Sequence, residues 1–559
     1  MKRDRIYKNI ILISMTLAAA MLFLVLYFDL ERRREAKGLT EDKGIYMQDN
    51  NIYDVYISVF PTENDEGEVM DLSAFSLHTS GNRDYNPVLD CNVQILNEGE
   101  TPDIKTDINS KNATIRVRGN TSRGDKYKSY KVKLENSAKP FFGQTNLNIN
   151  KHTWDITKIA TKLQTDLLVD IDDLLSYRTY FMRVWIRDTT LPEEEQQFQY
   201  QGLYTEIEQP DKEYLRVRGL GENGVMYKAR NFAFGFSDGL RNVDDPMYDK
   251  DKFEAVLGIQ AGNNHRKLLE MLAAVNDMSL DFKEVFQTYF DEENYLTWLA
   301  FNLLMGNEDV ISQNYIFFSL GNSKTWYFIP WDFDGALYFD KYVDTWQYPL
   351  SLRSMQRLNI SILHRRYFQI DGSIEKLQKK MEELLCKSIT RERVRELVAP
   401  YKGVLYKTLS IPPDDRLKDI TLEELMVYLD NLHEGMVESY ELYKRNIAYP
   451  IPVFVARPEK QEDGSLRFAW EPSYSYQGLA ITYKIQVLDD TMDKVIFEQE
   501  GIEDTCWVLK EGLKPGAYFL RVSVVDSEGH EQTNLEYSMK QAEDGWPVEI
   551  YGLLDFVID

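Results

Sequence analysis

Residues 300–336 read AFNLLMGNEDVISQNYIFFSLGNSKTWYFIPWDFDGA, and this stretch is the most informative part of the chain. An apolar run of helical character ends at Gly306 and is followed by a polar loop that carries Asp309 and Asn314. A short aromatic strand then leads to Trp331-Asp332-Phe333-Asp334. This arrangement is typical of a metal-dependent active site, but also of a buried strand whose loop carboxylates cap turns.

The spacing of the polar residues resembles the order found in protein kinases, where D-x-x-x-x-N is followed by a strand and D-F-G. Asp309, Asn314 and Asp332 occupy these positions, and Asp334 stands where the glycine would be. In that order the first acid orients the attacking hydroxyl, and the amide and the second acid hold metal. The stretch alone does not choose between this hypothesis and turn-capping carboxylates.

Length and charge limit the classes of protein. With 559 residues, of which 43% are hydrophobic, the chain is expected to fold into about two to four domains. The 65 basic and 90 acidic residues give a net charge of −25, which argues against nucleic-acid binding and favours basic partners. The spacing of the three cysteines rules out a disulfide scaffold, and the scattered positions of the six histidines argue against a histidine-built metal site.

Residues 9–28 read NIILISMTLAAAMLFLVLYF and are uncharged throughout. At about 1.5 Å per helical residue they would span a hydrocarbon core of about 30 Å. We therefore predict a single transmembrane anchor after a cytoplasmic N-terminus (1–8), then a stalk (29–50) and an extracytoplasmic body at the cell membrane. A cleaved signal peptide is the alternative, but no small-x-small site follows the apolar run.

Periodicity predicts an α+β body over residues 51–449. Short alternating or apolar bursts up to about residue 134 indicate strands, and residues 251–305 and 372–446 have helical periodicity. The order, strand-rich first and helix-rich later, is that of a two-lobed kinase, although it is not specific by itself.

Beyond Pro450 the pattern becomes all-β. Strands of seven to ten residues alternate with turns, and LKPGAYFLRVSVVDSEGH at 513–530 resembles the late strands of a fibronectin type III domain. We predict an immunoglobulin-like β-sandwich over residues 450–545 and a C-terminal tail over 546–559. Such a module more often presents or packs than catalyses.

A second candidate site lies in the strand-rich part. The turn after Arg116-Val-Arg118 carries Asn120 and Ser122 and is followed by several lysines, so its backbone N–H groups and cations could bind phosphates. An exposed basic hairpin is the competing interpretation. The G-x-G-x-x-G at 219–224 precedes a strand, not a helix, and this argues against a dinucleotide site.

Taken together, these segments resemble the CotH family, whose members are atypical protein kinases. The matching pieces are IRVRGNTSR, KSYKVKLE, GLYTEIEQPDKEYL, VMYKA, the 307–315 loop and IPWDFDGA, in family order over roughly residues 50–446. The RGNTSR turn and the WDFD strand end are the most specific of them. The segment after Trp154, DITKIATKLQTDLLVD, departs from the family pattern.

The resemblance implies roles for individual residues. Lys128, with Lys131 as a rival, would hold the nucleotide phosphates, and Glu208 would be its carboxylate partner. Asp309 would orient or deprotonate the acceptor hydroxyl. The resemblance also implies ATP and Mg²⁺, with metal held by Asn314, Asp332 and Asp334, and the rings of Tyr130 and Trp331 as adenine-stacking candidates.

We therefore expect a membrane-anchored, CotH-like protein kinase that transfers the ATP γ-phosphoryl group to Ser or Thr of surface or coat proteins. Its acidic charge favours basic, Ser-rich protein substrates and no nucleic acid. The alternative is a catalytically silent surface protein that binds a partner through the kinase-like fold and the β-sandwich. A glycosidase pair formed by Asp332 and Asp334 is disfavoured, because two residues apart on one strand they would not flank a sugar.

Overall fold

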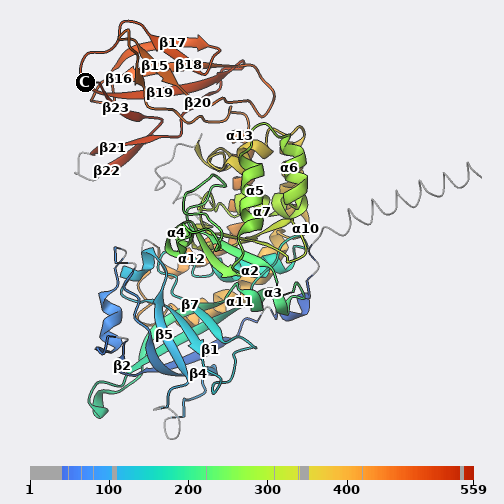
Figure 1. Ribbon diagram of the computed structural model, residues 1–559. Helices are drawn as coiled ribbons and strands as arrows, with labels where there is room; N and C mark the ends of the chain where they lie inside the picture. The colour runs from blue at the N-terminus through green and yellow to red at the C-terminus, as the bar shows by residue number, and fades with distance from the viewer. Residues whose placement is uncertain are drawn as a thin grey trace, which may run out of the picture.

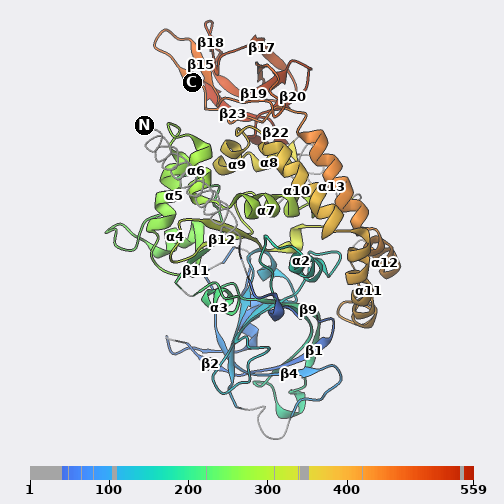
Figure 2. The same cartoon turned by 90° about the vertical axis from the view of Figure 1, so that its right-hand side faces the viewer.

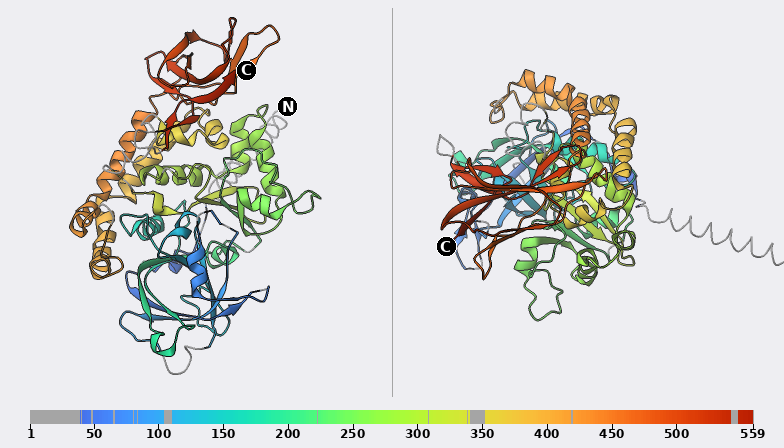
Figure 3. Two further views of the ribbon diagram at one scale, coloured as in Figure 1. Left: turned by 90° about the vertical axis from the view of Figure 1, so that its left-hand side faces the viewer. Right: turned by 90° about the horizontal axis from the view of Figure 1, so that it is seen from above.

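Three parts are stacked end to end in the computed structural model (Figures 1 and 3). A β-barrel forms one end, a helical region with a small sheet forms the middle, and a β-sandwich forms the other end. The structure describes residue 39 and residues 41–558, apart from 48, 65, 80, 83, 104–109, 222, 308, 338, 340–351, 418–419 and 542–546.

The first part is a closed barrel of seven strands. All neighbours pair antiparallel except β1 and β8, which run parallel with Ile52 opposite Phe181. Alternating residues such as Val55 and Ile57 fill the interior, as the period of two along each strand requires. In barrel order the strands are β1 (Ile52–Val59), β4 (Leu89–Asn97), β5 (Ala113–Arg118), β6 (Ser129–Leu134), β7 (Asn146–Asn150), β9 (Gln199–Glu208) and β8 (Thr179–Asp188).

Several short elements precede the barrel strands or lie in the connections between and after them. They are η1 (Lys43–Ile45), the hairpin β2 (Thr62–Glu63) and β3 (Val69–Met70), η2 (Leu72–Leu77), η3 (Thr121–Gly124), η4 (Glu193–Glu195) and α3 (Lys212–Val217).

The middle part is built on a four-stranded sheet in the order β11 (Leu257–Ala261), β10 (Val225–Ala229), β12 (Tyr315–Ser319) and β13 (Trp326–Pro330). Helix α7 (Glu292–Leu304) lies centrally (Figure 2) and is buried on all sides from Asn294 onward, consistent with apolar residues that are not confined to one face. The other helices are α2 (Ala160–Val169), α4 (Lys250–Val256), α5 (Arg266–Asn276), α6 (Phe282–Tyr289), η5 (Phe333–Gly335), α8 (Met355–Leu358), α9 (Ile362–Tyr367), α10 (Ser373–Lys387), α11 (Arg391–Thr408), α12 (Leu422–Asp430) and α13 (Leu432–Asn446).

The third part consists of two sheets that share one core, which includes Trp470 and Val522. One sheet has the order β14 (Glu459–Lys460), β15 (Leu466–Ala469) and β18 (Cys506–Leu509). The other is formed by β17 (Val495–Ile502), β16 (Ile481–Leu488), β19 (Gly516–Asp526) and β20 (Glu531–Thr533), with β23 (Leu554–Ile558) also on β19. A separate hairpin joins β21 (Tyr537–Gln541) to β22 (Pro547–Tyr551). Residues assigned to a tail thus form strands, and the fibronectin type III resemblance stays a prediction.

The predicted fold class, a two-lobed kinase-like fold behind a transmembrane helix, is wrong and is replaced by this mixed α/β architecture with a closed barrel. Strand patterning shows that strands exist but not that β1 closes onto β8, because that pairing joins segments far apart in the chain. The predicted membrane segment, 9–28, lies outside the described residues. Within the described residues, every helix is too short or too polar to cross a membrane.

Candidate active site

The loop after α7 fixes Asp309. Gly306 leaves the helix with a φ of +62°, and the Asn307 side chain then donates a hydrogen bond to Asn302 Oδ1 at 3.1 Å. The Asp309 backbone N–H donates to Asn307 Oδ1 at 3.4 Å. The first hydrogen bond fixes the loop to the end of α7, and the second fixes the backbone of Asp309 to the loop.

Asp309 and Asn314 are in direct contact, as their spacing predicts. The Asn314 amide donates to Asp309 Oδ2 at 2.5 Å, and Gln313 donates to Asp309 Oδ1 at 2.7 Å. Asn314 has a φ of +58°, a left-handed conformation that asparagine tolerates better than most residues. This conformation places Asn314 at the turn into β12 with its side chain on Asp309.

The WDFD segment turns sharply at the end of β13. Asp332 has a φ of +64°, and the short helix η5 follows. Trp331 and Phe333 are buried, whereas Asp332 is 38% exposed on its side chain. Gln164 of α2 donates to the Phe333 carbonyl at 3.2 Å and so fixes this turn against the helix.

Four carboxyl groups interact electrostatically near the end of β13, those of Asp155, Asp309, Asp332 and Asp334. The charge of Asp332, together with burial and with Asp155 and Asp309, raises the pKa of Asp334 well above its ordinary value. Burial, with Asp332 as a like charge, also raises the pKa of Asp309. Asp155 lies before α2, and its Oδ2 accepts from the N–H of Ala160, the first residue of that helix, at 3.0 Å. The site therefore favours bound positive charge.

Two cations face these acids. Lys228 of β10 places its Nζ 3.7 Å from Asp332 Oδ2 and 5.4 Å from the centre of the Trp331 ring. Arg118, at the end of β5, donates to Asn150 Oδ1, and burial lowers its pKa to about 10 although Asp332 and Asp334 favour its charged form. Burial also lowers the pKa of Lys228. Because Lys228 lies on β10 and Arg118 on β5, the site joins the barrel to the middle sheet.

The residues present fit Mg²⁺ together with a phosphate ligand. Within the described part of the chain, no three His, Cys, Asp or Glu side chains are grouped so as to hold a metal by themselves. Mg²⁺, however, is usually held by one or two carboxylates plus waters and substrate phosphates. The repelling carboxyl pair Asp332 and Asp334, with the Asn314 amide nearby, provides hard oxygen donors of this kind.

Lys128 is placed away from these groups. Its Nζ donates to the Arg123 carbonyl at 2.6 Å, and its side chain is buried at the base of the RGNTS turn. Its rival Lys131 donates to Gln209 Oε1 at 2.8 Å, and burial beside Arg116 and Arg118 lowers its pKa to about 8. Neither lysine contacts Asp332, whereas Lys228, which sequence reasoning missed, does so.

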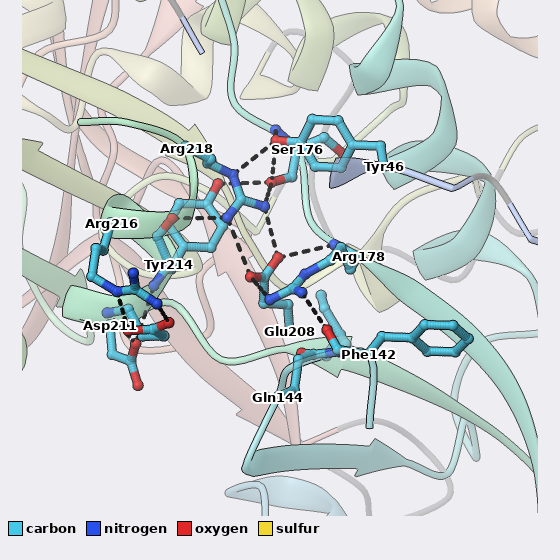
Figure 4. A network of polar contacts seen from close by, with 12 residues as sticks. Tyr46, Phe142, Gln144, Ser176, Arg178, Glu208, Asp211, Tyr214, Arg216 and Arg218 are labelled. Atoms are coloured by element: carbon cyan, nitrogen blue, oxygen red, sulfur yellow. Dashed lines mark hydrogen bonds and ion pairs between the residues drawn. The ribbon is translucent and has the colours of Figure 1, made fainter. Parts of the chain in front are cut away.

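Glu208 pairs with arginines and not with a lysine (Figure 4). Arg218 donates to it at 2.7 and 3.2 Å, and Arg178 donates from its guanidinium at 2.5 Å. Burial alone would raise the pKa of Glu208, but the charges and hydrogen bonds of Arg218 and Arg178 hold it below the ordinary value. Glu208 thus belongs to a buried cluster that joins β9, β8 and α3.

Of the remaining predicted residues, Tyr130, Asn120 and Ser122 lie in the barrel or its β5–β6 turn, and Trp331 lies in the core of the middle part. Tyr130 is buried in the barrel core against Tyr204, and Trp331 is buried edge-on to Tyr177. Asn120 is exposed in the turn. Ser122 lies under the glycine of that turn, since a Cβ on Gly119 would meet its Oγ at 2.3 Å. The turn is therefore tightly folded next to Arg118.

Sequence reasoning also passed over Asp155 and Gln164. Both lie in the segment that departs from the family pattern, and a signal was present: Asp155 with Thr157 just before an apolar helical run is a typical helix start.

The comparisons with known proteins identify the family. Residues 115–416, more than half of the 559-residue chain, match the family model described as CotH kinase protein. The chain is also similar to the inner spore coat protein H of Bacillus subtilis (strain 168), with 25% identity over 224 residues. That similarity covers 40% of this chain and 58% of the relative, less than two thirds of its length. Arg118, Lys228, Asp309, Asn314 and Asp332 all fall within the matched residues, and the chain thus belongs to the CotH kinase protein family.

Proposed function

We propose that this protein is an ATP-dependent protein kinase that phosphorylates Ser or Thr side chains. The observation that carries the proposal is the convergence of Asp309, Asn314 and Asp332 with the cations Lys228 and Arg118. Phosphoryl transfer needs an acid for the acceptor, a metal-holding pair and positive charge on the phosphates. Each of these requirements has a candidate in the site.

The roles follow from the contacts. Asp309, whose raised pKa makes it a better proton acceptor, orients the acceptor hydroxyl while Gln313 and Asn314 hold its carboxylate in place. Lys228 and Arg118 neutralise and position the phosphates. Asp332, Asp334 and Asn314 would hold Mg²⁺, which supplies further charge neutralisation. The serine oxygen bonds to the γ-phosphorus as the bond to the β–γ bridging oxygen breaks, giving ADP and phosphoserine, and the hydroxyl proton passes to Asp309 and then to solvent.

We further propose that the substrate is a basic, Ser-rich structural protein. The net charge of −25 would attract such a partner, and the similar Bacillus subtilis protein is a spore coat protein.

Incubation with γ-labelled ATP and Mg²⁺ tests the proposal. We expect label on the protein itself or on a Ser- and Lys-rich peptide, and loss of that label in Asp332→Ala and Asp309→Asn. Asp238→Ala, which alters an exposed aspartate in a different loop, is the matched control and should retain transfer. Absence of transfer together with absence of Mg²⁺-dependent ATP binding in a thermal-shift assay would favour the silent, partner-binding alternative.

A further inference from the structure

A separate cavity of about 280 Å³ lies beside the loop that carries Asp309 (residues 305–314). Residues of α7, α8 and α13 line it. Gly306 and Asn307 line it on one side of Asp309 in the chain, and Val310 and Ile311 line it on the other. A ligand in this cavity would therefore contact the same loop that positions the acceptor-orienting acid.

Arginine dominates the charged lining of the cavity. Arg353 precedes α8, Arg357 lies within it, and Arg445 comes from the last turn of α13. Among the lining residues that the structure describes, Glu438 is the one acidic residue. The cavity thus favours an anion.

The cavity is separate from the residues proposed to hold the nucleotide. Its volume, about 280 Å³, lies at the lower limit of small-molecule pockets, which have about 300–1,000 Å³. The nucleotide cations proposed above, Lys228 and Arg118, are not among the residues that line it. A second ligand, close to the acceptor hydroxyl, is the remaining candidate.

We propose that this cavity binds an anionic side chain of the protein substrate, and that a phosphoserine left by an earlier transfer is its ligand. The inference rests on the proposed kinase function. A phosphoserine carries a charge of about −1.5 to −2 and three acceptor oxygens, which match several guanidinium groups better than a single carboxylate does. In a Ser-rich substrate the first phosphorylated residue would then anchor the chain while a neighbouring serine reaches Asp309.

Peptide binding to the full chain tests this directly. Three fluorescent peptides of alternating Ser and Lys would carry Ser, phosphoserine or Glu at the centre, and their affinities would be measured by anisotropy without ATP. We expect the phosphoserine peptide to bind at least about tenfold more tightly than the Ser peptide, since hydrogen bonds between charged groups are stronger than those between neutral ones. Arg445→Glu should abolish this preference, and because Arg445 is exposed the variant should fold.

Lys444→Glu is the matched control, because Lys444 is the neighbouring cation of α13 and does not line the cavity. It should retain the preference. Equal binding of the Ser and phosphoserine peptides, or a preference that survives Arg445→Glu, would overturn the proposal. If the Glu peptide bound as tightly as the phosphoserine peptide, the assignment of phosphoserine as the ligand would be wrong, and the cavity would bind acidic segments in general.

Transfer measured afterwards with ATP and Mg²⁺ separates the two hypotheses. Phosphoserine-selective binding without transfer to any peptide would contradict the kinase proposal alone. Transfer to the Ser peptide without selective binding would contradict the cavity proposal alone.

Discussion

At the residue scale, the site is built from side chains on unusual backbone. Asn314 and Asp332 both have positive φ values, +58° and +64°, a conformation that costs a non-glycine residue on the order of 1 kcal/mol or more. Like-charged carboxyls crowd beside them. The strained backbone and the repelling carboxyl groups occur in the same site. This combination indicates that the fold holds these groups for binding and not for its own stability.

Lys228→Met should lower the transfer rate by about 10²-fold or more, because it removes the cation nearest to Asp332. The rate should be measured at saturating peptide, with ATP affinity measured separately by thermal shift.

Lys128→Met provides the comparison. Lys128 donates to the Arg123 carbonyl, so we expect a lower thermal midpoint but a transfer rate close to that of the wild type. The opposite result, with Lys128 essential and Lys228 dispensable, would return the phosphate role to the lysine that the family resemblance suggested.

Asp334→Asn should change how stability depends on pH. The Asp334 pKa is raised above its ordinary value of 3.8, so the folded state of metal-free wild type holds a proton that the unfolded state releases. Its unfolding free energy should therefore fall, relative to Asp334→Asn, as the pH rises from about 4 toward the raised pKa. Urea unfolding at a series of pH values would measure this difference. Mg²⁺ should reduce it, and a difference independent of pH would contradict the carboxyl repulsion.

The acidic half of the site could be predicted from sequence because its members are close in the chain. Asp309 and Asn314 share one loop, and Asp332 follows the next hairpin. Lys228 could not be predicted in the same way, since β10 reaches the site only by pairing with β12, with Lys228 opposite Ile316. Among several lysines near a strand end, pattern alone does not reveal which one a distant strand pairing brings to the acids.

At the scale of elements, the Glu208 cluster fastens β9 to its neighbours. Arg218 contacts Glu208, the Ser176 carbonyl and the Tyr214 carbonyl, and its side chain is fully buried (Figure 4). Tyr46 also contacts Arg218, so the segment before β1 is attached to the same cluster. We expect the cluster to be structural, because Glu208 is paired with two arginines within it.

Glu208→Gln should lower the unfolding free energy by about 3 kcal/mol, because two buried arginines would lose their counter-charge. The Glu208 pKa is lowered by folding, so the loss should be full near neutral pH and should shrink as the pH falls below about 4. Denaturant titration at both pH values checks this.

The transfer rate per folded molecule is the second readout for this variant. We expect it to stay within about threefold of the wild type, a difference of less than 1 kcal/mol in activation free energy. A fall of about 10²-fold in a fully folded variant would instead assign Glu208 to the active site.

Strands and helices were easier to predict than their assembly. The alternation of β5, whose residues are buried and half-buried in turn, is visible in ATIRVR. Closure of the barrel is not visible, because it depends on β1 pairing with β8 and not on any local pattern. The strands β22 and β23 were not predicted either, and their residues were assigned to a C-terminal tail. The residues before them show no strand periodicity, so the local pattern gave no sign that the sandwich continues.

At the scale of the whole molecule, a few polar contacts join the three parts. Asp414, between α11 and α12, accepts from Lys151 at 2.6 Å and from the Leu203 N–H of β9 at 2.6 Å, which joins helices to barrel. Arg365 of α9 donates to the Pro452 carbonyl at 3.1 Å and pairs with Glu471 of the sandwich. Its own carbonyl accepts from Tyr474 at 3.1 Å.

Arg365→Ala should loosen the sandwich from the helical part. We expect faster proteolysis near residues 449–452, because the carbonyl contact that holds this connection would be lost. Limited digestion followed by mass spectrometry would locate the cut. Glu471→Gln should have a much smaller effect, since Glu471 is 53% exposed and surface ion pairs contribute little. Equal effects from both variants would show that the ion pair, not the backbone contact, joins the two parts.

The order in which the barrel strands are synthesised has a consequence for the nascent chain. The first strand to be synthesised, β1, pairs with β8 along one of its two edges. The barrel closes only after β9, which ends at Glu208, has also been synthesised. Ribosomes add about 5–20 residues per second, so the edge of β1 waits for its partner for on the order of ten seconds. During that time it presents unpaired N–H and C=O groups to any other extended segment. Translation speed and chaperone supply, more than the stability of the finished molecule, should therefore set the yield of correctly folded protein.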